Sequence, residues 1–169
     1  MPAMKHAVPT LVALALATLV QPVSASDDAA ITRMALCRDS WIEWTKTDPK
    51  TFEAFRGHVT SLFAPHGNDP YWLPKAKTKV SVVGLNVSQL FPQSVGMGVG
   101  FSLTVDAPFD VAREAAKKVL GKTPEHCESS DGIKSCETAI GHQRTFMLMA
   151  ENGRKSRETL IGCYYFYEK

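Results

Sequence analysis

Four cysteines carry the clearest chemistry in the sequence, and two of them flank a turn. Asp131-Gly132 is typical of a two-residue hairpin turn, in which both central residues need positive φ. Centring the turn there places Cys127 directly opposite Cys136, at a non-hydrogen-bonded position where side chains of neighbouring strands come closest. The sequence therefore predicts a Cys127–Cys136 disulfide, and elimination pairs Cys37 with Cys163.

A zinc site is the alternative use of these thiols. His126 and His142 lie near Cys127 and Cys136 in the sequence, and histidine and cysteine are the usual ligands of structural zinc. The spacing lacks a Cys-x-x-Cys knuckle, and thiols of exported proteins usually oxidise. We therefore expect no metal and no other cofactor.

Familiar catalytic motifs are missing from the sequence. The histidines form no His-Glu-x-x-His pair, and no serine stands in a Gly-x-Ser-x-Gly turn. Disulfide pairing also removes the thiols as nucleophiles. An alternative interpretation as a hydrolase depends on His66 with Asp69, or on His142. We expect no catalytic residue, and nothing in the sequence positively indicates an enzyme.

Gly96, Gly98 and Gly100 alternate with apolar residues. This spacing differs from the Gly-x-Gly-x-x-Gly of nucleotide-binding turns, and no helix begins directly after it. The alternation instead predicts a strand with one bare face, against which another element packs closely. The alternative is that this face is a platform for a ligand or for envelope assembly.

A loop from His66 to Lys75 is predicted from its glycine, asparagine and two prolines. Tyr71 and Trp72 lie within it. Aromatic side chains on a proline-stiffened loop lose little entropy on binding and often dominate protein interfaces. We predict a binding site at His66, Tyr71 and Trp72. The alternative is that both rings cover one end of the core.

Residues 1–25 have the pattern of an export signal. Lys5 and His6 precede ten apolar residues, and Val23-Ser24-Ala25 supplies the small residues that signal peptidase reads. The apolar run is too short for a membrane span, which needs about 20 residues. We expect cleavage after Ala25, a mature chain of residues 26–169 without a membrane span, and a periplasmic or secreted location.

Composition narrows the class of partner and the number of domains. The net charge is +2, and the positive residues are not clustered as nucleic-acid or polybasic membrane surfaces require. We therefore expect no nucleic-acid partner. A mature chain of about 144 residues fits one domain.

Residue periodicity predicts an α+β domain of element order ααββαββββ. Apolar residues at helical spacing predict helices over Ala29–Thr45 and from Asp48-Pro49 to Pro65, which together form an αα-hairpin. A third helix is predicted from Phe109 to Gly121. Alternating residues predict a single antiparallel sheet of about six strands, with the helices on one face.

Two details of the strands are also predicted. Gly84 is interpreted as a bulge that joins two alternating segments of one strand. In the last hairpin, an odd-numbered connection is expected to place Phe146 and Leu148 on the same face as Leu160 and Gly162.

These features favour an exported, non-catalytic protein-binding domain, for example an inhibitor or immunity-type protein for an envelope enzyme. Its expected partner is another envelope or secreted protein. The alternatives are a small periplasmic hydrolase and a ligand-binding or envelope-assembly module.

Overall fold

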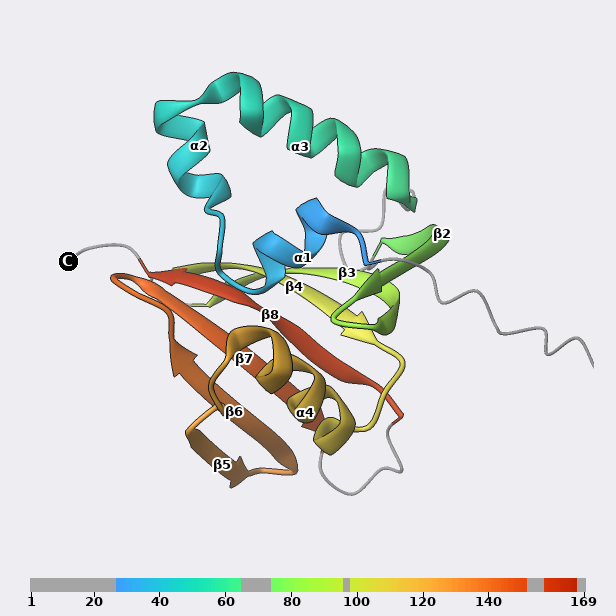
Figure 1. Ribbon diagram of the computed structural model, residues 1–169, viewed down its shortest axis with the longest axis vertical. Coiled ribbons are helices and arrows are strands. Elements are labelled where there is room, and N and C mark those ends of the chain that lie inside the picture. Colours follow the sequence, from blue (N-terminus) through green and yellow to red (C-terminus); the bar gives the residue numbers. More distant parts are fainter. Residues whose placement is uncertain (1–26, 65–73, 96–97, 152–156, 167–169) are drawn as a thin grey trace, which may run out of the picture.

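The computed structural model describes residues 27–64, 74–95, 98–151 and 157–166. Its strands are β1 (Phe63–Ala64), β2 (Lys75–Val82), β3 (Leu85–Val95), β4 (Gly98–Val105), β5 (His126–Ser130), β6 (Ile133–Ala139), β7 (Arg144–Glu151) and β8 (Thr159–Phe166). They form one antiparallel sheet in the order β1-β2-β3-β4-β8-β7-β6-β5 (Figure 1). The strand that comes last in the sequence therefore lies in the middle of the sheet.

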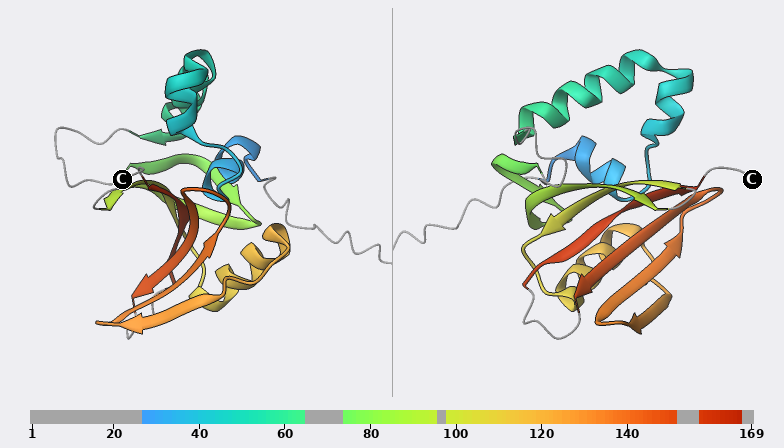
Figure 2. Two further views of the ribbon diagram at one scale, coloured as in Figure 1. Left: turned by 90° about the vertical axis from the view of Figure 1, so that its left-hand side faces the viewer. Right: turned by 180° about the vertical axis from the view of Figure 1, so that it is seen from behind.

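The two faces of this curved sheet differ in what covers them (Figure 2). What we call the first face carries buried side chains that alternate along the central strands: Phe101, Leu103, Val105, Phe146, Leu148, Ile161, Cys163 and Tyr165. The second face carries the residues between them: Gly100, Ser102, Thr104, Thr145, Met147, Met149, Leu160, Gly162, Tyr164 and Phe166.

The described helices are α1 (Ala29–Ala35), α2 (Trp41–Thr47), α3 (Pro49–Leu62) and α4 (Phe109–Leu120). Each of them contacts the first face. The ring of Phe55 in α3 packs on Phe101 at 5.6 Å, and Lys134 of β6 lies over the ring of Phe109 in α4. Within the described ranges, no helix packs on the second face (Figure 2).

Three short helices replace the predicted αα-hairpin, so that prediction is wrong. The helix expected over Ala29–Thr45 is interrupted because Cys37 adopts a left-handed φ of 59°. Ser40 Oγ then accepts the backbone N–H of Glu43 at 3.1 Å and starts α2, as Ser-x-x-Glu spacing favours. The predicted restart at Asp48-Pro49 is confirmed, because Asp48 caps α3.

The sheet has eight strands instead of about six, although the α+β class and the single antiparallel sheet are confirmed. Val83 and Gly84, at φ of 50° and 78°, form a tight turn between β2 and β3. Gly84 therefore belongs to a hairpin and not to a bulge. The register shift between β3 and β4 lies at Ser88, between Val87 and Gln89. β1 adds a further strand of two residues.

Two disulfides are confirmed. Cys127 lies opposite Cys136 in the β5–β6 ladder, and the turn at Asp131-Gly132 has positive φ at both residues. The second bridge joins Cys37 to Cys163 and ties the segment after α1 to the centre of the sheet.

The predicted register of the last hairpin is wrong. Phe146 pairs with Cys163, and Leu148 pairs with Ile161. These four side chains share the first face, whereas Leu160 points to the second. A shift by one residue would turn every side chain of β8 to the other face. The bridge from Cys163 to Cys37, which lies among the helices, is compatible only with the observed register.

The third predicted helix is confirmed as α4, which buries Phe109, Ala112 and Ala116 and ends before Gly121. None of the helices in the described residues combines the length and the hydropathy needed to cross a membrane.

Candidate functional site

The predicted binding loop lies outside the described residues. His66, Tyr71 and Trp72 all fall between residues 65 and 73, so a site there stays a prediction. Of the histidines considered for a hydrolase, His142 is described, and it is exposed in the connection between β6 and β7. All four cysteines are paired, and the described residues contain no cluster of His, Cys, Asp and Glu suited to a metal ion.

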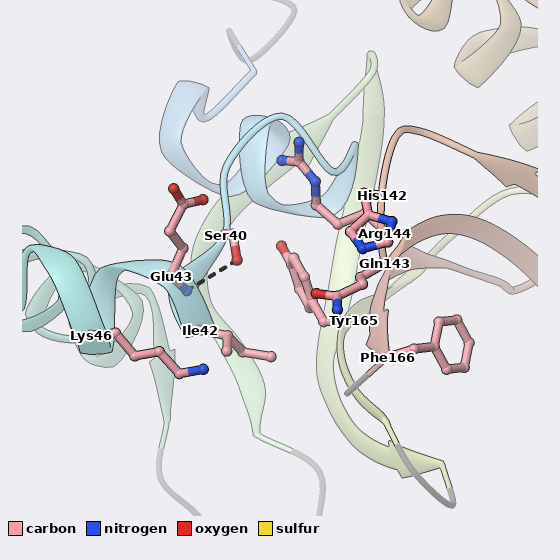
Figure 3. Close-up of a pocket in the computed structure, with 9 residues that line it drawn as sticks. All are labelled: Ser40, Ile42, Glu43, Lys46, His142, Gln143, Arg144, Tyr165 and Phe166. Atoms are coloured by element: carbon pink, nitrogen blue, oxygen red, sulfur yellow. Dashed lines mark hydrogen bonds between the residues drawn. The ribbon is translucent and has the colours of Figure 1, made fainter. Parts of the chain in front are cut away.

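A pocket of about 380 Å³ lies between α2 and the end of the sheet where β7 begins and β8 ends (Figure 3). Its volume is near the lower limit of small-molecule sites, which span roughly 300–1,000 Å³. Three segments distant in the sequence line it: Ser40, Ile42, Glu43 and Lys46; His142, Gln143 and Arg144; and Tyr165 and Phe166.

Tyr165 forms a rigid wall of this pocket. Its hydroxyl donates a hydrogen bond to the backbone carbonyl of Asp39 at 2.6 Å, and its ring packs edge-on against Trp41. Burial raises the pKa of Tyr165 well above the ordinary value, while nearby Arg144 lowers it and Asp39 raises it further. The phenol is therefore a neutral, fixed group and not an acid or base at ordinary pH.

Gln143 and Arg144 form the wall of the pocket next to Tyr165, since Arg144 pairs with Tyr165 in the β7–β8 ladder. Gln143 has a left-handed φ of 61°, which is uncommon for a residue other than glycine. Its carbonyl accepts the N–H of Phe166 at 2.9 Å, and its side chain extends toward the pocket (Figure 3). Arg144 donates through Nη1 to the carbonyl of Cys37 at 3.0 Å. A disulfide-bonded residue thus anchors the guanidinium.

Lys46 and Glu43 bring unpaired charges from α2. They stand three residues apart, yet no ion pair joins them, and neither side chain has another hydrogen-bond or ion-pair partner among the described residues. Figure 3 shows the Lys46 ammonium directed toward Ile42 and the interior of the pocket, whereas the Glu43 carboxylate points away toward α1. The charge facing the interior from α2 is therefore positive.

A second feature lies on the second face, toward the β5 edge of the sheet. Ile133 is 42% exposed there, and Met147 and Met149 of β7 are partly buried on the same face. Phe166, which is 41% exposed, lies on the same face at the other end of β7, where its N–H bonds Gln143. Three glutamates on three strands occupy second-face positions near Ile133: Glu128, Glu137 and Glu151. The basic residues of β6 and β7, Lys134 and Arg144, lie on the first face.

Close internal packing explains the bare face of β4 where it is described. Tyr164 of β8 lies over Gly100, and a Cβ at that glycine would stand 2.8 Å from the Tyr164 ring. Tyr164 is fully buried, and its hydroxyl is 3.2 Å from Ser102 Oγ. Gly100 therefore makes room for a side chain of the same domain.

Sequence reasoning missed the pocket. Of the lining residues, it considered His142 for chemistry, as part of the hydrolase alternative. The Ser-x-x-Glu signal at Ser40 would have located the start of α2, but no sequence pattern links Lys46 with Gln143. Comparison with protein-family models, with curated proteins and with solved structures found no match to this chain.

Proposed function

We propose that the protein is an exported, non-catalytic binding domain that holds another envelope or secreted protein, as an inhibitor or immunity protein holds its enzyme. The observation that carries the proposal is the exposed apolar centre around Ile133 on the second face, with glutamates around it. Contiguous apolar surface with a polar rim is typical of protein interaction sites.

The chemistry of this surface favours a particular kind of partner. Met147 and Met149 are flexible and polarisable, and such side chains adapt to the shape of an opposing surface. Glu128 and Glu137 are exposed on the same face, where His126 pairs with Glu137 and no lysine or arginine occupies a neighbouring β5 or β6 position. The matching partner surface has an apolar centre surrounded by lysine or arginine.

The disulfides support the location. Two bridges, and no free thiol in the described residues, are typical of proteins that fold outside the cytoplasm. The export signal predicted over residues 1–25 would supply the route.

The test compares two variants in binding to a partner captured from the envelope extract of the source organism. A variant with both Ile133→Lys and Glu137→Lys should lose at least about tenfold in affinity, because it places two cations opposite a basic partner. Val111→Lys is the matched control, since Val111 is 51% exposed on α4, which packs on the first face.

Three results would support the proposal together: retained binding by Val111→Lys, loss by the double variant, and weaker binding of wild type at high salt. Equal affinity of the double variant and the wild type, with unchanged melting temperatures, would refute it.

A further inference from the structure

The pocket beside Tyr165 is separate from the proposed protein-binding surface. Its polar groups come from the α2 segment, from the β6–β7 connection and from the first face at the start of β7 and the end of β8, whereas that surface lies on the second face of β6 and β7. Phe166 lines the pocket and lies on the second face, but it stands at the other end of β7 from Ile133. We propose that this pocket binds the carboxylate group of a small ligand with an apolar body.

The charge of the pocket favours an anion. The lining contains one lysine, Lys46, and one arginine, Arg144, whereas Glu43 is its one acidic residue. Since Glu43 points away from the interior, the Lys46 ammonium is the charge that an entering ligand meets (Figure 3). Hydrogen bonds between an ammonium and a carboxylate are stronger than those between neutral groups.

The neutral groups favour a carboxylate attached to an apolar body. The amide of Gln143 supplies an N–H donor, and its side chain has no partner in the described part of the chain. Ile42 and the ring of Tyr165 offer apolar surface beside these polar groups. A ligand with its charge at one end and a ring or aliphatic chain at the other matches both parts.

The scaffold holds these groups in place before a ligand arrives. Tyr165 is fixed by its bond to Asp39, and Arg144 by its bond to Cys37, whose disulfide reaches β8. Gln143 keeps its left-handed backbone while its carbonyl binds Phe166. Strained backbone of this kind tends to occur at functional sites. Prior ordering lowers the entropic cost of binding.

The experiment titrates the purified exported protein with phenylacetate and follows backbone amide signals by NMR. Phenylacetate should shift the signals of Gln143, Arg144 and Phe166, and it should bind at least about tenfold more tightly than neutral phenylacetamide. Lys46→Met should weaken phenylacetate binding by a similar factor, and Lys46→Arg should retain it.

Lys50→Met is the matched control, since Lys50 is an exposed residue at the start of α3 that does not line the pocket. It should leave phenylacetate binding unchanged. The double variant of the second face should bind phenylacetate as wild type does, so the two proposals fail separately.

A free small acid and the C-terminus of a peptide both present this chemistry. A short peptide ending in phenylalanine, with a free or an amidated C-terminus, distinguishes them. Tighter binding of the free-acid peptide than of phenylacetate assigns the pocket to a chain terminus, and weaker binding assigns it to a free acid. Equal binding of phenylacetate and phenylacetamide, or no effect of Lys46→Met, would overturn the proposal, as would the absence of shifts near Gln143.

Discussion

Replacing Gly162 with alanine should destabilise the protein strongly, because β4 and β8 approach each other too closely there for a methyl group. A Cβ at Gly162 would lie 2.4 Å from Ser102 Oγ, 2.5 Å from the carbonyl oxygen of Phe101 and 2.6 Å from Ser102 Cα. Two of these three atoms belong to the backbone, so rotation of a side chain does not relieve the clash.

The size of the destabilisation follows from the clash being with backbone atoms. Overpacking a core with an added methylene costs typically 1–3 kcal/mol, and a clash with the backbone belongs at the upper end of that range. We therefore expect Gly162→Ala to lower the free energy of unfolding by about 3 kcal/mol. For a domain of this size that corresponds to a melting temperature lower by roughly 10 °C.

Gly57→Ala is the matched control, since the same methyl group is added where it meets nothing. Gly57 lies inside α3, and a Cβ there has no neighbour within 4 Å. Alanine favours a helix interior by roughly 0.5–1 kcal/mol relative to glycine, so this variant should be more stable than wild type. Urea unfolding followed by circular dichroism measures both variants. A Gly162→Ala protein as stable as Gly57→Ala would refute the reasoning.

Three further predictions concern the elements around the pocket. Replacing both Cys37 and Cys163 with alanine should lower the free energy of unfolding by about 5 kcal/mol in the loop-entropy model, against about 3 kcal/mol for the hairpin bridge; urea unfolding of the two double variants compares them. Because burial raises the pKa of Tyr165, its neutral form stabilises the fold fully below the ordinary tyrosine pKa near 10, and this contribution is lost as pH rises from there through the folded-state pKa. Melting temperatures measured at increasing alkaline pH should therefore fall less steeply for Tyr165→Phe than for wild type. An equally steep fall in both proteins would contradict the role given to Tyr165. Ser40→Ala should cost about 1 kcal/mol through loss of the α2 cap, measured by urea unfolding; a stability equal to wild type would contradict that role.

Local signals made part of this fold predictable. The Asp131-Gly132 turn set the register of its hairpin and therefore the pairing of Cys127 with Cys136. A similar turn between β2 and β3 was missed because Val83 occupies a left-handed position that β-branched residues rarely adopt. A turn can be predicted from the sequence when its residues are of the types that commonly adopt positive φ.

Long-range contacts account for the remaining errors. The register of β8 depends on the bridge to Cys37. The predicted first helix is interrupted at the same Cys37, between α1 and α2. The pocket depends on α2 lying next to the start of β7, which no spacing in the sequence indicates. Lys46 and Gln143 are ordinary surface residues until tertiary structure brings them to one cavity.

The central position of β8 has a consequence for the order of assembly. On one side of it stand β1 to β4, and on the other β5 to β7, and these two groups share no strand pairing except through β8. During synthesis from the N-terminus, each group has all its own partners before β8 emerges. The two half-sheets are then separate, and each presents an unpaired edge of the kind that promotes association between chains. Arrival of the C-terminal segment closes both edges at once, and it also brings Cys163 to Cys37.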